Sequence, residues 1–192
     1  MARTLRDKSS VLPLLAEIFR DLGYEGASYG QITSRTGISK GSLYHLFPGG
    51  KAQMAAELLA EIDAWFVVNI YNPLETAPPQ QALSRMWAEA ASYFHDGRRV
   101  CLVGVFALDA TRDQFAAAIH HYFAGWVGAL TICLTRAGCA PENAATLAED
   151  AVLGIQGALV LARALNDPGL FTRSLQRLAK AMDAALATRD AH

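Results

Sequence analysis

Apolar residues recur at the spacing of an α-helix along almost the whole chain, and this periodicity limits the fold more than any other feature. The first stripe consists of Val11, Leu12, Leu15, Ile18, Phe19 and Leu22. No stretch shows the sustained alternation of apolar and polar residues that a half-buried strand requires. The sequence therefore predicts an all-α fold of about nine helices, with an N-terminal three-helix helix-turn-helix domain and a larger helical ligand-binding and dimerisation domain.

Proline and glycine residues mark where these helices begin and end. We expect Pro13 in the first turn of the first helix or at a small kink, Gly23 at its end, and a break between Asn72-Pro73 and Pro78-Pro79. The expected helices are about 9–22, 28–35, 39–47, 51–70, 80–96, 103–110, 113–137, 141–166 and 168–188. We place the boundary between the two domains after residue 50, giving domains 1–50 and 51–192.

Charge is distributed unevenly along the 192 residues. Residues 1–51 contain seven Lys or Arg and four Asp or Glu, a net charge of +3, whereas the whole chain has a net charge of −1. This overall charge argues against indiscriminate binding to nucleic acid. The basic N-terminal segment on an acidic body instead indicates a local anionic partner.

Cysteine usage and hydropathy indicate a cytoplasmic protein. The three cysteines, Cys101, Cys133 and Cys139, are odd in number and form no CxxC pair, so we expect reduced thiols. A redox role for Cys101 is the alternative interpretation. The most apolar stretch, residues 151–165, is shorter than the roughly 20 residues that span a bilayer, so we expect a buried helix and no membrane.

Catalytic, metal and cofactor sites are not indicated by the sequence. The adjacent residues His120 and His121 point to different faces of a helix and cannot easily chelate one ion together. Gly50-Lys51 lacks the first glycine of a phosphate-binding loop, and no Ser/His/Asp set has a defining context. We therefore expect no catalytic residue, no metal and no cofactor, and we do not expect an enzyme.

The stretch from Ser28 to Phe47 has the pattern of a helix-turn-helix. Ser28 and Ser39 can each cap a short helix, and Gly37 between them can adopt the left-handed backbone of a tight turn. The residues expected to face inward are apolar: Ile32, Ile38, Leu43 and Phe47. This arrangement allows the second helix to enter the major groove of DNA.

The exposed side of this motif has the chemistry to bind DNA. Lys40 can contact a phosphate, and Gly41 has no side chain to hold the groove wall away. Ser42, Tyr44 and His45 offer hydrogen-bond donors, and Lys51 can contact another phosphate. The predicted DNA-binding residues are Ser28, Thr33, Thr36, Ser39, Lys40, Gly41, Ser42, Tyr44, His45 and Lys51.

Residues 10–60 resemble the N-terminal domain of TetR-family transcriptional regulators. The resemblance is carried by the segments Phe19–Ser28, Ile32–Phe47 and Pro48-Gly-Gly-Lys51. The last segment resembles a branch that includes drug- and flavonoid-responsive repressors, and residues 101–105 and Phe171 match that branch more loosely. Gln31 and the bulky Tyr29 depart from the usual pattern, and these two residues can alter base preference without altering the fold.

The resemblance implies a ligand-responsive regulator, most simply a repressor that a small molecule releases from a double-stranded DNA operator. It also implies a homodimer, which we expect through the last two helices. Two stripes suit that interface: Ala151, Gly154, Ala158, Leu161 and Leu165, followed by Phe171, Leu175, Leu178, Met182 and Leu186. Intramolecular packing of these stripes is the alternative.

Aromatic residues are concentrated between residues 65 and 126, a region with few charges. This composition suits a small apolar or aromatic effector better than a nucleotide. The predicted ligand-binding residues are Trp65, Phe66, Trp87, Phe94, Phe106, His120, Phe123 and Trp126. A small-molecule-sequestering protein with vestigial DNA binding is the alternative function.

Overall fold

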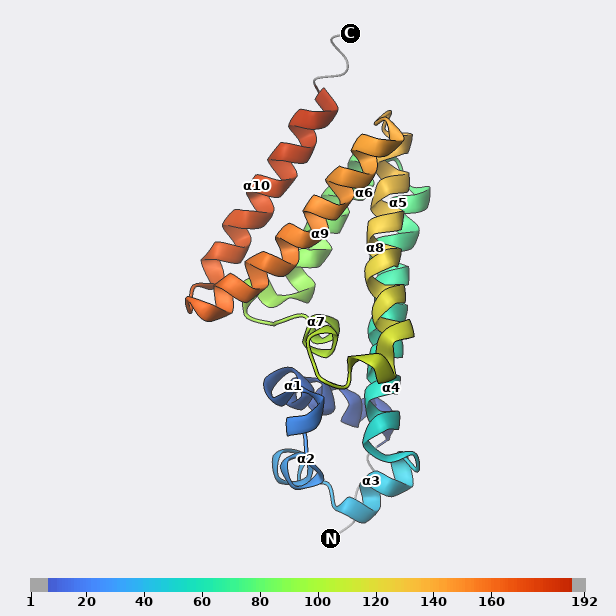
Figure 1. Ribbon diagram of the computed structural model, residues 1–192, viewed down its shortest axis with the longest axis vertical. Helices are drawn as coiled ribbons and strands as arrows, with labels where there is room; N and C mark the ends of the chain where they lie inside the picture. The colour runs from blue at the N-terminus through green and yellow to red at the C-terminus, as the bar shows by residue number, and fades with distance from the viewer. Residues whose placement is uncertain (1–6, 188–192) are drawn as a thin grey trace. The chain divides into compact units, whose positions relative to one another are not determined.

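The computed structural model describes residues 7–187 and contains no strand in that range, so the predicted all-α class is confirmed (Figure 1). The α-helices are α1 (Lys8–Gly26), α2 (Tyr29–Thr36), α3 (Lys40–Leu46), α4 (Gly50–Phe66), α5 (Asn72–Thr76), α6 (Pro79–Tyr93), α7 (Leu102–Ala107), α8 (Ala116–Arg136), α9 (Pro141–Ala164) and α10 (Pro168–Ala187). A π-helix, η1 (Val67–Tyr71), and two 3₁₀-helices, η2 (His95–Gly97) and η3 (Arg112–Phe115), complete the described elements.

The helices follow the predicted ranges approximately, but several ends differ: α4 continues as a π-helix after Phe66, α6 ends at Tyr93 rather than Asp96, α7 ends at Ala107 rather than Ala110, and a 3₁₀-helix precedes α8. The short α5 forms where the sequence indicated a break, because its proline lies in the first turn, where no backbone N–H is needed. Helix α1 begins earlier than expected, since the carboxylate of Asp7 accepts a 2.9 Å hydrogen bond from the Ser10 N–H and caps it. Pro13 therefore lies in the second turn. The predicted end of the last helix at Thr188 falls outside the described residues.

The chain divides into two compact units. Unit 1 consists of Met1–Asp63 with Leu102–Ile119, and unit 2 of Ala64–Cys101 with His120–His192. The chain therefore passes between them three times, within α4, before α7 and within α8. This division does not follow the predicted boundary after residue 50, so the functional domains 1–50 and 51–192 stay a prediction.

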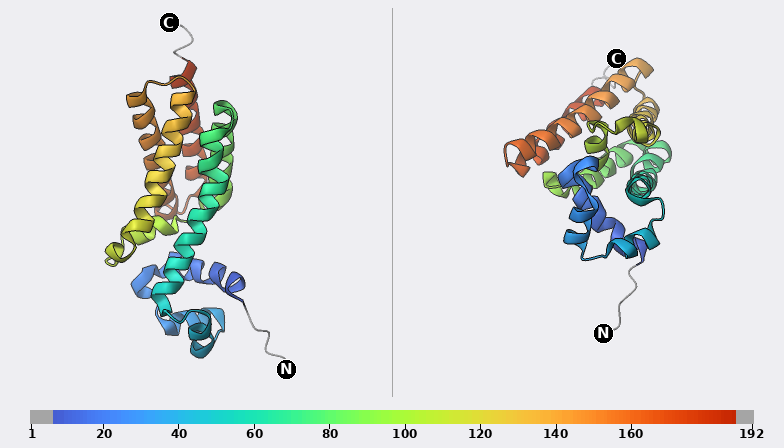
Figure 2. Two further views of the ribbon diagram at one scale, coloured as in Figure 1. Left: turned by 90° about the vertical axis from the view of Figure 1, so that its right-hand side faces the viewer. Right: turned by 60° about the horizontal axis from the view of Figure 1, so that its bottom comes forward.

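Unit 1 groups α1, α2 and α3 with the first turns of α4 and with α7 (Figure 2). The core side chains Leu15, Ile32, Leu43, Phe47 and Met54 are all fully buried. Burial of these side chains explains why the short helices form, because helices of this length need tertiary packing to be stable in water.

An aromatic group joins α1 to α7 within unit 1. The ring centroids of Phe19 and Phe106 are 5.8 Å apart, and those of Tyr24 and Phe115 are 5.2 Å apart. Gly23 adopts φ 68° and ψ 179°, so the regular part of α1 ends there as predicted. The carboxylate of Asp109 accepts a 3.1 Å hydrogen bond from the Tyr24 N–H beyond this break. Residues 102–119 thereby complete the core of unit 1.

In unit 2, helix α10 packs against α9, α6 and η2, and α9 and α10 run side by side in Figure 1. A Cβ added at Gly154 of α9 would lie 2.8 Å from the methyl carbons of Leu178 on α10. Ala151 and Ala158 are also buried. This part of the predicted dimer stripe, together with Leu178, therefore packs within one protomer, because the small residues of α9 let α10 approach closely.

Candidate nucleic-acid interface

The turn between α2 and α3 has the geometry that the sequence predicted. The Ser28 hydroxyl accepts a 3.3 Å hydrogen bond from the Gln31 N–H, and the Ser39 hydroxyl accepts a 3.2 Å bond from the Ser42 N–H. Gly37 lies in the left-handed region at φ 66°. Each helix thus begins at a serine cap, and the glycine makes the turn between them.

The predicted DNA-binding residues differ in how much of each side chain reaches solvent. Lys40, Gly41, Tyr44 and His45 of α3 are exposed, as are the caps Ser28 and Ser39. Thr33, Ser42 and Lys51 are half-buried. The structure thus brings most of the predicted set to the surface of α2 and α3, and DNA contact by each residue stays a prediction.

Thr36 is the exception, because it is buried. Its hydroxyl donates a 2.7 Å hydrogen bond to the Ile32 carbonyl and accepts a 3.1 Å bond from the Ile38 N–H. The hydroxyl that we expected at the DNA backbone is therefore built into the turn. A threonine one residue before a turn glycine can contact the DNA backbone or form hydrogen bonds within the turn, and the sequence pattern does not distinguish these two roles.

Lys51 is also engaged within unit 1. Its ammonium group donates a 2.8 Å hydrogen bond to the Tyr24 carbonyl and lies 4.2 Å from the centroid of the Tyr24 ring. An ammonium group has three donors, so a phosphate contact stays compatible with this position. Lys51 nevertheless ties the start of α4 to the end of α1 in this structure.

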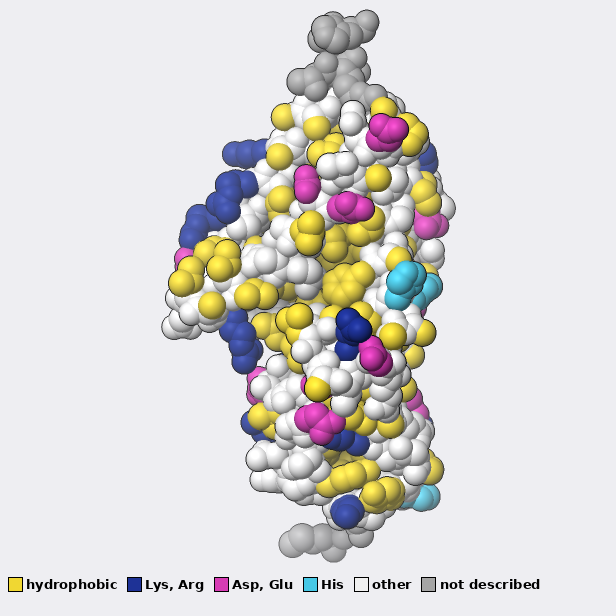
Figure 3. All heavy atoms as spheres, viewed as in Figure 1, with side chains coloured by type: hydrophobic (Ala, Val, Ile, Leu, Met, Phe, Trp, Pro, Cys, Tyr) yellow, Lys and Arg dark blue, Asp and Glu magenta, His cyan; other side chains and the backbone are white. Residues whose placement is uncertain are grey.

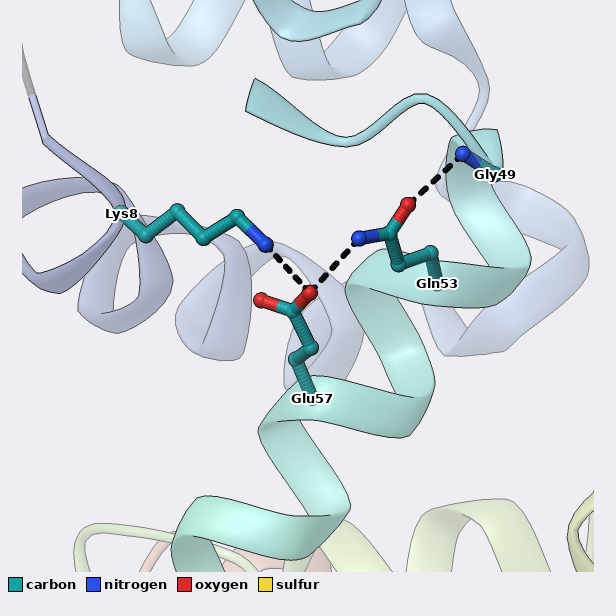
Figure 4. A network of polar contacts seen from close by, with 4 residues as sticks. All are labelled: Lys8, Gly49, Gln53 and Glu57. Carbon is teal, nitrogen blue, oxygen red and sulfur yellow. Dashed lines mark hydrogen bonds and ion pairs between the residues drawn. The ribbon is translucent and has the colours of Figure 1, made fainter.

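A polar network that the sequence analysis missed fixes the same end of α4 (Figure 4). The Gln53 side chain accepts a 2.7 Å hydrogen bond from the Gly49 N–H and donates a 2.7 Å bond to the Glu57 carboxylate. The Lys8 ammonium forms an ion pair with the same carboxylate. The i, i+4 spacing of Gly49, Gln53 and Glu57 was the available signal, whereas nothing in the sequence indicated the distant Lys8.

The environment of Glu57 has opposing effects on its ionisation. Burial acts to raise the pKa of the carboxyl, but the hydrogen bonds from Lys8 and Gln53 outweigh it and hold the pKa below its ordinary value. The carboxylate is therefore ionised near neutral pH, where it joins α1 to α4.

Unit 2 contains an aromatic cluster, which we define as Phe66, Tyr71, Tyr93, Tyr122 and Trp126. Phe66 and Trp126 were predicted ligand-binding residues, and the three tyrosines were not. The centroid of Phe66 lies 4.6 Å from that of Tyr122 and 5.1 Å from that of Trp126. Trp65, Phe94 and Phe123 contact the edge of the aromatic cluster through Tyr93 and Tyr122. Helix spacing placed these residues on related faces, so the sequence could predict part of this cluster.

Three other predicted ligand-binding residues lie elsewhere. Phe106 belongs to unit 1, where it packs on Phe19 and Phe115, because α7 is part of that core. His120 is exposed, and Trp87 is half-buried on α6. Proximity along the sequence did not reveal that residues 102–119 leave unit 2.

Polar groups inside the aromatic cluster are anchored by residues far apart in the sequence. The Tyr71 hydroxyl donates a 2.7 Å hydrogen bond to the Tyr122 carbonyl, and the Cys101 thiol lies 3.8 Å from the Tyr122 hydroxyl. Burial raises the pKa of Tyr122 well above its ordinary value. The indole N–H of Trp126 is buried with no acceptor among the described residues, as is one amide nitrogen of Gln156 on α9.

The cysteines and the other potential metal ligands do not form a metal site among the described residues. All three cysteines are free and buried, and no cluster of three or more His, Cys, Asp or Glu occurs among residues 7–187 that could hold a metal. Two helical segments, Arg112–Arg136 and Pro141–Ala164, are long and apolar enough to cross a membrane by length and composition alone. Core helices of soluble proteins have the same properties.

Comparison with known proteins assigns both parts of the chain. Residues 15–58 match the family described as bacterial regulatory proteins, tetR family. Residues 79–181, more than half of the chain, match the family described as transcriptional regulator LmrA/YxaF-like, C-terminal domain. The chain belongs to the TetR family. It is a DNA-binding transcriptional regulator, and the proteins of this family are regulators rather than enzymes.

Relatives of this TetR-family chain match over most of their length. The HTH-type transcriptional regulator LmrA of Bacillus subtilis (strain 168) is 25% identical over 159 residues, which cover 80% of this chain and 85% of LmrA. A TetR transcriptional regulator from Legionella pneumophila has a similar structure, with a TM-score of 0.78, 16% identity, and coverage of 93% of this chain and 98% of that one. A regulatory protein TetR from Rhodobacter sphaeroides gives a TM-score of 0.73 at 23% identity, covering 91% and 95% of the two chains.

Proposed function

We propose that this TetR-family regulator is a cytoplasmic, dimeric repressor that a small apolar or aromatic molecule releases from its operator. The observation that carries the proposal is the exposed face of α3, where Lys40, Gly41, Tyr44 and His45 reach solvent beside the capped turn. Two such helices, related by the two-fold axis of a dimer, suit successive major grooves of a palindromic site.

The dimer face that we propose lies on the outer side of α9. Leu153, Val160, Leu161 and Leu165 are 69%, 61%, 51% and 63% exposed. Leu153, Val160 and Leu161 lie on one side of α9 by their spacing, and Leu165 directly follows its last residue. No described atom lies within 4 Å of a Cβ at Gly157 among them, so a second helix has room to approach. In Figure 3, the side of α9 turned to the viewer carries hydrophobic side chains interleaved with acidic ones.

Val160→Glu tests this dimer face. A buried carboxylate without a partner is costly, so we expect the variant to sediment as a monomer and to lose operator binding. Ser84→Glu, at an exposed position on α6, is the matched control and should stay dimeric. A Val160→Glu protein that remains a dimer would place the interface elsewhere.

The effector site that we propose is the aromatic cluster of unit 2. Phe66 and Trp126 are fully buried, and such rings favour a planar apolar ligand. The free N–H of Trp126 supports a ligand with one hydrogen-bond acceptor, because an unsatisfied buried donor costs about 1–3 kcal/mol. Binding of such a molecule requires the packed cluster to open.

Coupling between effector and DNA is proposed to pass through α7. Cys101 contacts Tyr122 in unit 2, and the next residue begins α7, which packs on α1 through Phe106 and Phe19. A ligand that displaces Tyr122 would therefore act on the chain that leads directly into the core of unit 1. By linkage, DNA must weaken effector binding by the same factor as effector weakens DNA binding.

The decisive experiment selects an operator from a random duplex DNA pool with the wild-type protein, and then titrates a panel of planar aromatic compounds into the complex. At least one compound should lower operator affinity, and operator DNA should lower the affinity for that compound equally. Unchanged operator affinity across the panel would contradict the effector proposal. Unchanged DNA binding after substitution of Lys40 and Tyr44 would instead favour a sequestering protein.

A further inference from the structure

Tyr29, the bulky residue that departs from the family pattern, lies against the recognition helix. Its ring stacks on that of Tyr44 with a centroid distance of 5.2 Å and an interplanar angle of 16°. Tyr29 is the first residue of α2 and Tyr44 is in α3. We call these two residues the tyrosine pair. It adds a direct aromatic contact between the two helices beside the turn at Gly37.

The Tyr29 hydroxyl is held by the start of α4. A Cβ at Gly50 would lie 2.6 Å from this oxygen, so the glycine makes the space that the hydroxyl occupies. Burial, with a smaller effect of Tyr44, raises the pKa of Tyr29. With its hydroxyl against Gly50 and its ring stacked on Tyr44, Tyr29 is poorly placed to read a base.

Lys40 lies over both rings of the tyrosine pair. Its ammonium nitrogen is 5.4 Å from the Tyr29 centroid and 5.9 Å from the Tyr44 centroid. Both distances fall within the range of cation–π attraction. A free lysine side chain loses considerable rotamer freedom when it is immobilised on a partner, so prior ordering reduces the cost of binding.

We propose that Tyr29 is a positioning residue for DNA binding, which, together with Tyr44, holds Lys40 in place for its phosphate contact. The inference rests on the proposed contact between Lys40 and DNA and extends it to a residue on another helix. Tyr29 sets operator affinity through Lys40 rather than through a base contact of its own. Its effect is therefore independent of operator sequence.

A double-mutant cycle tests this dependence. The affinities of wild-type protein, Tyr29→Leu, Lys40→Met and the double variant are measured on the operator selected by the wild type. Each single substitution should weaken binding about 5- to 10-fold, because a dimer has two such sites. The double variant should be little weaker than Lys40→Met alone. Losses that simply multiply would overturn the proposal, because Tyr29 would then act independently of Lys40.

The salt dependence distinguishes positioning from a general structural role. Lys40→Met should lower the slope of log affinity against log salt by about two for the dimer, because each protomer then leaves one phosphate without its cation. Tyr29→Leu should lower the slope in the same direction. A Tyr29→Leu protein that binds more weakly with an unchanged slope contradicts the proposal, because its weaker binding would not involve an ionic interaction.

Two further measurements do not depend on the folding of Tyr29→Leu. Tyr29→Phe keeps the ring but removes the hydroxyl, and we expect its affinity to stay within about twofold of wild type. A loss of affinity as large as that of Lys40→Met would assign the effect to the hydroxyl and overturn the role of the ring.

In the wild-type protein, the Lys40 methylene protons should show upfield ring-current shifts in NMR spectra. Chemical shifts typical of a lysine in a disordered peptide would contradict the proposal that the tyrosine pair holds Lys40.

Failure of the Tyr29 proposal can be told apart from failure of the proposed function. If the wild-type protein binds its operator specifically and the effects of the Tyr29 and Lys40 substitutions on affinity multiply, the positioning role of Tyr29 is wrong while the proposed DNA-binding function still holds. If the wild-type protein selects no duplex from the pool, the proposed operator binding is wrong, and so is the role of Tyr29 that depends on it.

Discussion

The helix-turn-helix of unit 1 and the aromatic cluster of unit 2 are held together in different ways. In the helix-turn-helix, Ser28 and Ser39 each bond to a backbone N–H three residues further along the chain. In the aromatic cluster, the Tyr71 hydroxyl reaches a carbonyl 51 residues away. The first region therefore builds its geometry from neighbouring residues and leaves Lys40, Tyr44 and His45 exposed at its surface, whereas the second depends on contacts between distant segments, so that a change in it alters packing.

Glycines give the sharpest test of this comparison, because their surroundings differ between the two regions. Gly97 of unit 2 has φ 88°, and a Cβ there would lie 2.5 Å from the Cβ of Phe171. We expect Gly97→Ala to lower the free energy of unfolding by about 3 kcal/mol, from strain and steric overlap together. Chemical denaturation measures this loss.

The control for that substitution is Gly128→Ala, on α8 within unit 2. No described atom lies within 4 Å of its added Cβ, so stability should change by no more than about 1 kcal/mol. If Gly97→Ala is as stable as Gly128→Ala, the packing of unit 2 adjusts to the added Cβ beside Phe171, which would contradict the expected difference between the two regions.

Gly41 of α3 should show the opposite behaviour. No described atom lies within 4 Å of an added Cβ, so Gly41→Ala should preserve stability or raise it by up to about 1 kcal/mol. If the groove wall approaches this residue, operator affinity should fall about tenfold, which corresponds to about 1.4 kcal/mol. A fluorescence anisotropy titration measures the affinity.

Gly30→Ala is the matched control within the same helix-turn-helix. Gly30 is exposed on α2, outside the predicted DNA contacts, and its substitution should leave operator affinity unchanged. Equal losses for the two variants would show that α3 does not approach DNA more closely than α2.

Trp126→Phe tests whether the unsatisfied N–H of the aromatic cluster serves a ligand. The smaller phenylalanine ring loses packing energy, but the substitution also removes the penalty of about 1–3 kcal/mol for the unsatisfied N–H. Because the two effects oppose each other, the free energy of unfolding should change by less than about 1 kcal/mol. Affinity for an effector with a hydrogen-bond acceptor should fall about tenfold in isothermal titration. Trp87→Phe, at a half-buried position outside the aromatic cluster, is the control. An unaltered effector affinity in Trp126→Phe contradicts the assignment.

Glu57→Gln should have the smallest effect, because the pair with Lys8 is partly exposed. We expect a loss below about 1 kcal/mol at neutral pH. The folded-state pKa of Glu57 is lowered, so its contribution is present above the ordinary carboxyl pKa and disappears as the pH falls through the folded-state value. Thermal melts should therefore converge for the two proteins in acid, and a constant difference at every pH would contradict the ionic role.

Local patterns explain why the helix-turn-helix could be predicted from the sequence. The serine caps, Gly37 and the buried side chains Ile32 and Leu43 each follow from a few neighbouring residues. The sequence could not reveal that Thr36 turns its hydroxyl inward, nor that Lys8 reaches Glu57, since both depend on how helices pack. Likewise, Phe106 lies among aromatic residues in the sequence, yet its helix belongs to the core of the other unit.

The stripe on α9 illustrates the same distinction. Helical spacing identified small residues that suit close packing, and Gly154 does pack closely, but against Leu178 of the same protomer. Spacing specifies a face of a helix but not the partner on that face. Leu161 and Leu165, which were in the same predicted stripe, remain exposed on the outer side.

The π-helical turn Val67–Tyr71 has a consequence for the length of the chain. It lies between α4 and α5 without interruption, and a π-helical turn is equivalent to an α-helix that has accommodated one inserted residue. Deleting the exposed Val68 would let this turn return to regular α-helix, while the residues before and after it keep their faces, because the wide turn absorbs the extra residue. Tyr71 would then keep its place against Gly125. The aromatic cluster should therefore tolerate a chain that is shorter by one position at this turn, whereas a deletion within the regular part of α4 would turn every later residue by about 100°.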